Sequence, residues 1–418
     1  MMLRRFEAAC YAAGDLGFNF VWQSIELYLL FYYIRGLGIA PAVASGIFLA
    51  GAAVDWLTDP VIGAVADRLA PRVPLRAWVS IGGPLSVVML CLAFAPPPVP
   101  AAWVPGYALA TYLALRFFYG LGNIPYAALT ARLSPDPADH LRLTGARMQG
   151  AALGGLIAAL TYALLPADRG GGADFRLGAL ILAGLAMPAF FATSFGTRER
   201  VLPRSGPPRP LGEAVAAMAA LLRRSAALRR LIVTIVMVGL TVTLINKSLL
   251  FLFEQVGAPR LGYFVALVPA LSLLLTAPLW ARLAIRSGQI RTLRIAAVAV
   301  LVMAVLALIG RDVATALLCI TLAIIAGQGM SVMFWSLVPA TVASCEISDQ
   351  DAGYAVRVYA MATIARKLAQ ALAPQAIALA LVLPDGALLV TIACVAAMTL
   401  LTVLFYPPIG PSHPHAAA

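Results

Sequence analysis

The chain has 418 residues, of which 62% are hydrophobic and only 11% are charged, and its mean hydropathy is +0.91. A soluble domain of this size needs far more polar surface, so the composition indicates a membrane protein. The formal net charge of +12 comes mainly from arginines in the loops between apolar runs, a placement that follows membrane topology and argues against nucleic-acid binding.

Apolar runs long enough to cross a bilayer, about 20 residues each, recur along the whole chain. They predict an all-α membrane protein with twelve transmembrane helices. The predicted spans are residues 8–34, 43–66, 77–95, 106–130, 148–166, 177–196, 231–256, 261–284, 295–310, 314–343, 357–383 and 387–406.

Most of the loop arginines lie on one side of the predicted membrane. With the N-terminus inside, those on the opposite side are Arg35, Arg169, Arg176, Arg260 and Arg311. This asymmetry is the positive-inside signature, and it predicts that both termini are cytoplasmic. We expect a multi-pass protein of a bacterial inner membrane that contacts the lipid bilayer and binds no nucleic acid.

Polar side chains recur at helical spacing in the first span. Asp15, Asn19, Gln23 and Glu26 are separated by 4, 4 and 3 residues, which places them on one face of a helix. Aromatic residues such as Trp22 lie between them. A polar stripe with aromatic rings suits a hydroxyl-rich ligand, which it would hold by hydrogen bonding and stacking. The alternative is a polar face that packs on neighbouring helices.

The second span carries a pair of carboxylates. Asp55 and Asp59 are four residues apart, so their side chains share one helix face, and the hydroxyl of Thr58 is adjacent. Two carboxylates this close in a medium of low dielectric repel each other, so one of them holds a proton or a cation lies between them. The sequence therefore predicts a site for Na⁺ or H⁺. The alternative is a structural ion pair with a lysine or arginine elsewhere.

At the cytoplasmic end of the same span, Gly63, Asp67, Arg68 and Arg72 form the pattern G-x-x-x-D-R-x-x-x-R. This pattern resembles the loop motif between helices two and three of major facilitator transporters, which implies a role in gating. Positive-inside arginines beside a helix-end aspartate are the simpler interpretation.

Arg116 places a charge at mid-depth in the fourth span. It would either face an anionic substrate or pair with Asp15 or an acid of the second span, and we favour pairing because an unpaired charge in hydrocarbon is costly.

Residues 197–230 are rich in proline and arginine at first and then amphipathic and basic. They divide six predicted spans from six. We expect an N-terminal half over 1–196, a cytoplasmic linker over 197–230, a C-terminal half over 231–406 and a cytoplasmic tail over 407–418. Two six-helix halves are the layout of a major facilitator transporter.

The chain has only two lysines, Lys247 and Lys367, and both lie inside predicted spans. An ammonium group there costs about 2.5–3.5 kcal/mol on insertion scales, so each lysine needs an acidic partner or a watery cavity. Lys247 would pair with Glu254 or contact a substrate carboxylate. In the tenth span, Trp335 would complete a substrate cavity or serve only in packing.

Two stretches of the sequence indicate a particular family among the major facilitator transporters. The patterns D-x-x-T-D-P-x-I-G and R-x-P-x-R-x-W begin at Asp55 and Arg72, and Y-G-L-G-N-I-P-Y-A-A-L begins at Tyr119. They resemble the glycoside–pentoside–hexuronide:cation symporters, the melibiose-permease group. That resemblance implies the major facilitator fold, with Asp55, Asp59 and Thr58 at the cation site.

Other roles also follow from the resemblance. Lys367 takes the place of the helix-eleven lysine that faces the cation site. Asp15 and Asn123 match the sugar-binding positions, with Tyr119 nearby, and Arg142 and Arg147 match the gating arginines of the loop between helices four and five. The helix-four tryptophan that stacks on sugar in that group is replaced by Ala127.

Catalytic motifs are absent from the sequence, so we expect no enzyme and no cofactor beyond a coupling ion, Na⁺ or H⁺. We expect a functional monomer that transports a sugar, glycoside or similar polyhydroxylated solute together with that cation, by alternating access. One alternative keeps the fold and carries a lysolipid or an organic acid, whose anionic group Arg116 and Lys247 would serve. The other is a membrane sensor or membrane enzyme that transports nothing.

Overall fold

The structure is a computed structural model that describes residues 5–69, 71–165, 174–201, 211–310, 312–346 and 354–406. Within these ranges the long elements are all α-helices, and the described residues of each predicted span are mainly helical. The predicted tail at 407–418 lies outside the described residues.

The first six spans form the following elements: α1 Arg5–Ser24 continued by two π-helical segments, η1 Ile25–Leu29 and η2 Tyr32–Gly36; α2 Pro41–Leu69; α3 Leu75–Ala93; η3 Ala101–Trp103; α4 Val104–Leu133; α5 Pro137–Leu164; and α6 Phe175–Gly196. The linker contains the amphipathic helix α7 Leu211–Arg224. The last six spans form α8 Ala226–Gln255, α9 Pro259–Val265, α10 Val268–Ser287, α11 Gln289–Gly310, α12 Val313–Glu346, α13 Tyr354–Leu381 and α14 Ala387–Leu404, so the eighth span is divided between α9 and α10.

By length and hydropathy, eight helical stretches among the described residues qualify as candidate membrane spans. The four predicted spans that fall short are α1, α4, α5 and α13. Each of these carries a charged residue of the predicted site, namely Asp15, Arg116, Arg147 and Lys367 respectively. Charged side chains lower the mean hydropathy of a helix, although α2 and α8, which also carry predicted site residues, still qualify.

Contacts divide the chain into two compact units. Unit 1 comprises Met1–Pro208 and Leu249–Leu271, and unit 2 comprises Arg209–Ser248 and Ser272–Ala418. The predicted halves differ from these units in one respect, because the end of α8, α9 and the start of α10 group with the N-terminal helices. The halves defined by chain order stay a prediction.

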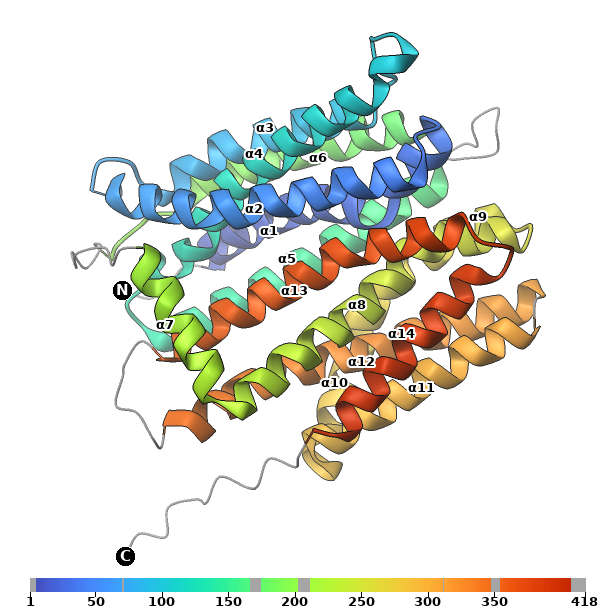
Figure 1. Ribbon diagram of the computed structural model, residues 1–418. Coiled ribbons are helices and arrows are strands. Elements are labelled where there is room, and N and C mark those ends of the chain that lie inside the picture. The colour runs from blue at the N-terminus through green and yellow to red at the C-terminus, as the bar shows by residue number, and fades with distance from the viewer. Residues whose placement is uncertain are drawn as a thin grey trace, which may run out of the picture. The chain divides into compact units, whose positions relative to one another are not determined.

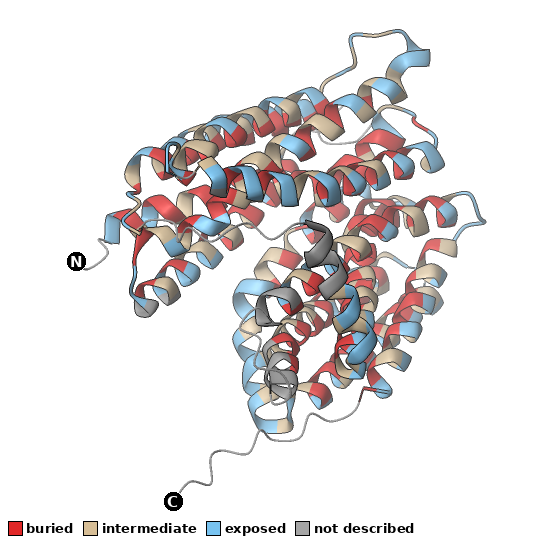
Figure 2. Ribbon diagram, turned by 60° about the vertical axis from the view of Figure 1, so that its left-hand side comes forward, coloured by how far each residue is buried: buried red, intermediate tan, exposed pale blue. Residues whose placement is uncertain are grey.

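Within unit 1, α1 packs on α5 and α6, α3 packs on α4 and α6, and α2 packs on α4 (Figure 1). Buried residues gather where these helices face one another, while the outward faces are exposed (Figure 2). Those outward faces are apolar: Leu57 is 73% and Phe195 79% exposed. Large apolar side chains on the outside are expected where lipid is the solvent.

In unit 2, α11 packs on α12 and α14, and α13 contacts both α12 and α14. The hydroxyls of Thr241 on α8 and Thr399 on α14 lie 2.7 Å apart and are buried. Small polar residues of this kind join helices within a bilayer by hydrogen bonds.

Glycines let α3 and α4 approach backbone to backbone. A Cβ atom added to Gly82 would lie 2.9 Å from the carbonyl carbon of Leu121 and would also meet the backbone of Gly122. We therefore expect Gly82→Ala to destabilise the protein by about 1–3 kcal/mol, since the helices must separate. The matched control is Gly184→Ala on α6, where a Cβ would meet nothing within 4 Å. Thermal unfolding midpoints of the two variants check this, and equal midpoints would contradict it.

Candidate functional site

The polar stripe of the first span lies in unit 1. Asp15 is buried and its neighbours Asn19, Gln23 and Glu26 are half-buried. The Asn19 side-chain amide donates a hydrogen bond to the Asp15 carbonyl, at 2.9 Å. The α-helix changes to π-helical turns after Ser24. The helical spacing of 3.6 residues per turn therefore holds for Asp15, Asn19 and Gln23, whereas Glu26 lies in a wider turn.

The carboxylate of Asp15 binds an arginine from α5. Arg147 Nε lies 3.2 Å from Asp15 Oδ1, and its guanidinium carbon lies 5.3 Å from the centroid of the Tyr126 ring. The Tyr126 hydroxyl donates to the Tyr11 carbonyl at 2.7 Å, which fixes the ring under the guanidinium. The sequence assigned Asp15 to substrate and Arg147 to gating, and the structure brings the two residues together.

A second, more deeply buried ion pair joins α2 to α4. Arg116 donates from Nε to Asp55 Oδ1 at 3.1 Å and from Nη2 to Oδ2, and the two residues are 8% and 4% exposed respectively. The prediction that Arg116 pairs with an acid is confirmed, and the acid belongs to the second span. The Trp22 ring centroid lies 5.1 Å from the guanidinium carbon, in the range of a cation–π contact.

Matched positions on α2 and α4 explain how these charges meet. The two helices run in the same direction with a common four-residue register. The facing pairs are Gly51 with Tyr112, Asp55 with Arg116, Asp59 with Gly120 and Gly63 with Ile124. Residues four apart lie on one helix face, so this register places Asp59 one turn beyond the ion pair.

Asp59 is half-buried, and a Cβ atom on Gly120 would lie 3.1 Å from its Oδ1. Glycine at this position therefore leaves space for the carboxylate beside α4. Thr58, predicted as an additional oxygen ligand, donates its hydroxyl to the Val54 carbonyl at 2.8 Å, and its oxygen keeps acceptor capacity. Among the described residues, no group of three or more His, Cys, Asp or Glu side chains has a metal-binding arrangement.

Aromatic rings surround the polar groups of α1 and α4. Tyr119 lies 5.8 Å from Trp22 and 5.5 Å from Phe18, measured between ring centroids. Asn123, one turn further along α4, is half-buried. Tyr126 was not predicted as a site residue although its motif was recognised. The signal available was its position, three residues after Asn123 and on nearly the same helix face.

The predicted residues of the C-terminal half lie in unit 2. Lys247 on α8 is 3% exposed, and Lys367 on α13 is half-buried. Trp335 on α12 is half-buried, with the guanidinium carbon of Arg366 5.9 Å from its ring centroid. The meeting of Lys367 with the acids of α2 stays a prediction.

Glu254, which the sequence offered as a partner for Lys247, binds Arg35 of unit 1 at 2.8 Å. The seven residues between Lys247 and Glu254 correspond to about 10 Å along the axis of α8, so the two side chains start two turns apart.

The predicted gating residues lie at the ends of helices. Arg68 at the end of α2 and Arg72 in the following turn are exposed, and the side chain of Asp67 lies outside the described residues. Arg142 in the second turn of α5 is exposed, and its Nη1 lies 3.3 Å from Oδ1 of Asp139.

A contact that the sequence did not predict fixes the start of the linker to the helices of unit 1. Arg200 Nη2 lies 2.8 Å from Oε2 of the buried Glu7 on α1, and its Nη1 donates to the Leu133 carbonyl at the end of α4. The hydrogen bond to Glu7 raises the pKa of Arg200. The linker residues around Arg200 are therefore attached to two helices of the bundle.

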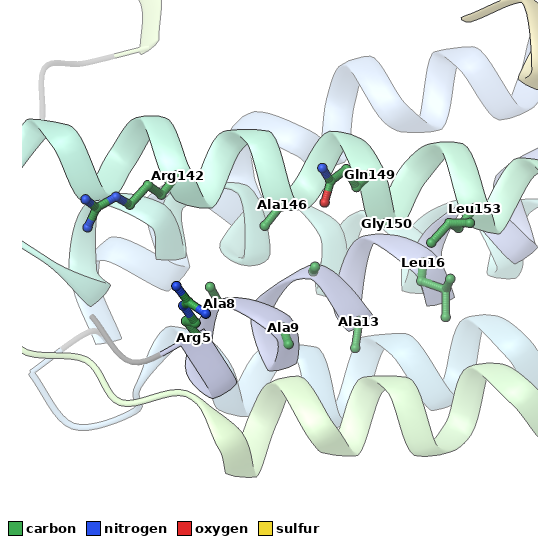
Figure 3. A pocket seen from close by; sticks show the side chains of 11 residues that line it. Arg5, Ala8, Ala9, Ala13, Leu16, Arg142, Ala146, Gln149, Gly150 and Leu153 are labelled. Carbon is green, nitrogen blue, oxygen red and sulfur yellow. The ribbon is translucent and has the colours of Figure 1, made fainter. Parts of the chain in front are cut away.

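A hollow of about 670 Å³ lies between α1 and α5, toward the start of both helices (Figure 3). Its wall consists mostly of small and apolar residues, alanine above all, with Arg5, Arg142 and Gln149 as the polar groups. Arg142 is the predicted site residue on this wall. The predicted substrate residues of α1 and α4 are not part of it.

Charged groups that form ion pairs between the spans of a helical membrane protein are typical of proteins that move solutes or ions across the bilayer. The chain belongs to the family described as MFS/sugar transport protein, whose model matches residues 10–408. This result confirms the predicted class, an all-α membrane protein with the major facilitator fold, and places the chain among transporters and not among enzymes. Twelve transmembrane helices agree with this fold, and the division into two six-helix halves stays a prediction.

Curated relatives and a solved structure agree with this assignment. The inner membrane symporter YicJ of Escherichia coli (strain K12) is 30% identical over 46% of this chain and 42% of its own length. The isoprimeverose transporter of Lactiplantibacillus pentosus is 28% identical over 47% of this chain and 42% of its own length. The chain thus matches less than half of the length of these relatives. The nucleoside transporter NupG shares the fold with a TM-score of 0.69 at 13% identity, over 96% of this chain and 98% of its own.

Proposed function

We propose that this protein is a symporter that couples a cation, Na⁺ or H⁺, to the movement of a neutral polyhydroxylated solute such as a glycoside. It acts in the bacterial inner membrane, as a monomer with both termini in the cytoplasm. The observation that carries the proposal is two ion pairs, Asp15–Arg147 between α1 and α5 and Asp55–Arg116 between α2 and α4. On the polar faces of these helices, carboxylates outnumber guanidinium groups.

The charge balance of this region favours a neutral solute over an anionic one. Both arginines are bound to carboxylates, as the ion pairs Asp15–Arg147 and Asp55–Arg116. Asp59 on α2 and Glu26 in the π-helical turn after α1 are two further half-buried acids of these spans. An excess of acidic groups in low dielectric repels a phosphate or a carboxylate, and it attracts a cation. A lysolipid or an organic acid fits this region less well than a sugar.

Hydroxyl-rich solutes match the remaining groups. Asp15 keeps acceptor capacity beyond its bond to Arg147, and Asn123 both donates and accepts, so the two residues can bind vicinal hydroxyls. Trp22 and Tyr119 offer ring faces on which the apolar side of a pyranose stacks. Hydrogen-bonding groups and aromatic ring faces are both features of pockets for polar but uncharged ligands.

Coupling follows from the cost of occluding a bare charge. We propose that the cation binds at Asp59, with Thr58 beside it and Lys367 as a nearby counter-charge. Without the cation, closing the site would carry the charge of the Asp59 carboxylate into a dry environment, so the empty site resists closure. When cation and solute are both bound, the two halves can rock so that the site opens to the other side of the membrane, which is the alternating-access cycle.

Ligand-induced thermal stabilisation tests the choice of solute. We expect glycosides to raise the unfolding temperature of the purified protein and Na⁺ to increase the effect relative to choline. Asp15→Asn should lose the response, whereas Asp385→Asn, the same change at an exposed loop residue, should keep it. Stabilisation by lysolipids or organic acids alone, with none by sugars, would overturn the proposed solute class.

A further inference from the structure

The last turns of α8 lie inside unit 1, although in chain order they belong to the C-terminal half. Every residue from Leu249 to Phe253 is buried, so this end of the helix is covered on all sides. The end of the first span is covered in the same way, since every residue from Leu27 to Leu30 is buried. Both helix ends are therefore packed among other parts of unit 1.

Aromatic rings join these two helix ends. The ring centroid of Phe251 on α8 lies 4.9 Å from that of Phe31. Tyr263 on α9 stacks on Tyr28, with the centroids 6.1 Å apart and the ring planes at 9°. Phe175 at the start of α6 lies 6.2 Å from Tyr263. Ring pairs at these distances stabilise a contact beyond the area that they bury.

An ion pair lies at the edge of this ring cluster. Arg35 Nε is 2.8 Å from Glu254 Oε2, and the guanidinium carbon is 5.9 Å from the centroid of the Phe251 ring. The two side chains are 46% and 37% exposed, so water reaches the pair. Exposed ion pairs contribute little to stability. This contact can therefore break and form again at low cost.

The opposite end of the first span has different surroundings. There the hollow of about 670 Å³ lies between α1 and α5, toward the start of both helices (Figure 3). The span also changes between its two ends, because Ser24 is followed by the π-helical segments that contain Tyr28 and Arg35. Helices kink at π-helical turns, which are frequent at functional sites. The end of the span that carries the rings can therefore bend relative to the end that carries Asp15.

We propose that these contacts form a gate on the side of the membrane opposite the cytoplasm, that the gate is closed in this structure, and that Arg35–Glu254 is its latch. The gate consists of Tyr28, Phe31 and Arg35 on the first span and of Phe251, Glu254 and Tyr263 opposite them. Because α8 is continuous over Ala226–Gln255, Phe251 and Glu254 move with the rest of that helix. When the site opens to this side, the latch breaks and the rings of Phe251 and Tyr263 leave those of Phe31 and Tyr28. The gate requires only that the protein is a transporter, whatever its solute and coupling ion, and its side of the membrane rests on the proposed topology.

The accessibility of a cysteine placed at Gln23 tests the gate. Gln23 is half-buried on α1, before the π-helical turns. The rate at which Gln23→Cys reacts with a membrane-impermeant maleimide is measured for the full-length chain in right-side-out vesicles and in inverted vesicles. The gate variants are made in this Gln23→Cys parent. The chain without Gln23→Cys gives the background from the native cysteines.

Arg35→Glu places two like charges at the latch. We expect it to raise labelling in right-side-out vesicles about tenfold and to lower labelling in inverted vesicles, because the population shifts toward the state that is open on the outside. Phe31→Ala removes a half-buried ring that contacts Phe251 and should act in the same direction. The exchange Arg35→Glu/Glu254→Arg restores the attraction and should return both rates to within about twofold of the parent. The control is Arg260→Glu, the same change at an exposed arginine of α9, which should alter neither rate.

Unchanged rates in a folded Arg35→Glu protein would overturn the gate, as would a double variant that is labelled from the outside as fast as the single one. A protein that has only loosened is labelled faster in both kinds of vesicle, so a rise in both also counts against the gate. Opposite changes that appear in the exchanged kinds of vesicle would support the gate and contradict the proposed topology. Neither solute nor Na⁺ enters the measurement, so failure of the proposed symport leaves the result on the gate unaffected.

Discussion

Replacing Asp59 with asparagine will abolish the accumulation of solute against its gradient. The amide has the same shape but carries no charge, so it neither takes up a proton nor attracts Na⁺, and the site can close without the coupling ion. Solute will then only equilibrate. A membrane potential of 100 mV supplies about 2.3 kcal/mol per charge, equivalent to about fiftyfold accumulation for one cation per solute, and the variant should fall to about onefold.

Uptake into proteoliposomes against imposed Na⁺ and H⁺ gradients measures this effect. Solute exchange without a gradient should persist in Asp59→Asn, because binding and rocking do not need the ion once the charge is gone. Asp385→Asn is the control, as it makes the same change at an exposed loop residue of unit 2. A variant that still accumulates solute would show that Asp59 does not couple the cation.

The second large effect concerns the buried pair Asp55–Arg116. Removing one partner leaves the other charge buried without compensation, which costs about 3–5 kcal/mol in comparable pairs. We expect Arg116→Met to lower the stability of the protein by this amount, whereas Arg116→Met together with Asp55→Leu should recover most of the loss. Replacing both charges with apolar groups of similar size is often neutral or stabilising.

Thermal unfolding midpoints of the single and double variants form a double-mutant cycle for this pair. Arg282→Met serves as the control, since Arg282 is exposed on α10. A double variant whose loss of stability equals the sum of the losses of Arg116→Met and Asp55→Leu would mean that the two residues act independently and that the pair is not the source of the stability. The cycle measures stability without any transport assay.

The sequence predicted the helices well because the information is local. Hydropathy over about twenty residues locates a span, and the described residues of each predicted span are mainly helical in the structure. Structural details that depend on contacts with other helices were not predicted. The π-helical turns after Ser24 and the break between α9 and α10 leave no clear trace in hydropathy. The grouping of Leu249–Leu271 with the N-terminal helices likewise depends on contacts distant in sequence.

The same distinction between local and long-range information applies to the residues of the candidate site. The sequence identified Asp15, Asp55, Asp59 and Arg116 from the cost of placing charges in hydrocarbon, which depends only on the residue and its surroundings along the chain. It predicted that Arg116 pairs with an acid but left the acid open. Tyr126 was overlooked because its role lies in a ring face toward Arg147, on another helix.

The sequence by itself determined the class of this protein, a helical membrane transporter, together with the charged residues that we propose for its site. Only the tertiary structure decided the partners: Arg147 for Asp15, Arg116 for Asp55, and glycine opposite Asp59. The physical reason is that burial cost and helical period are properties of single segments, whereas ion pairing depends on the register between helices. One turn of register along α4 separates the position that faces Asp55, occupied by Arg116, from the position that faces Asp59, occupied by Gly120.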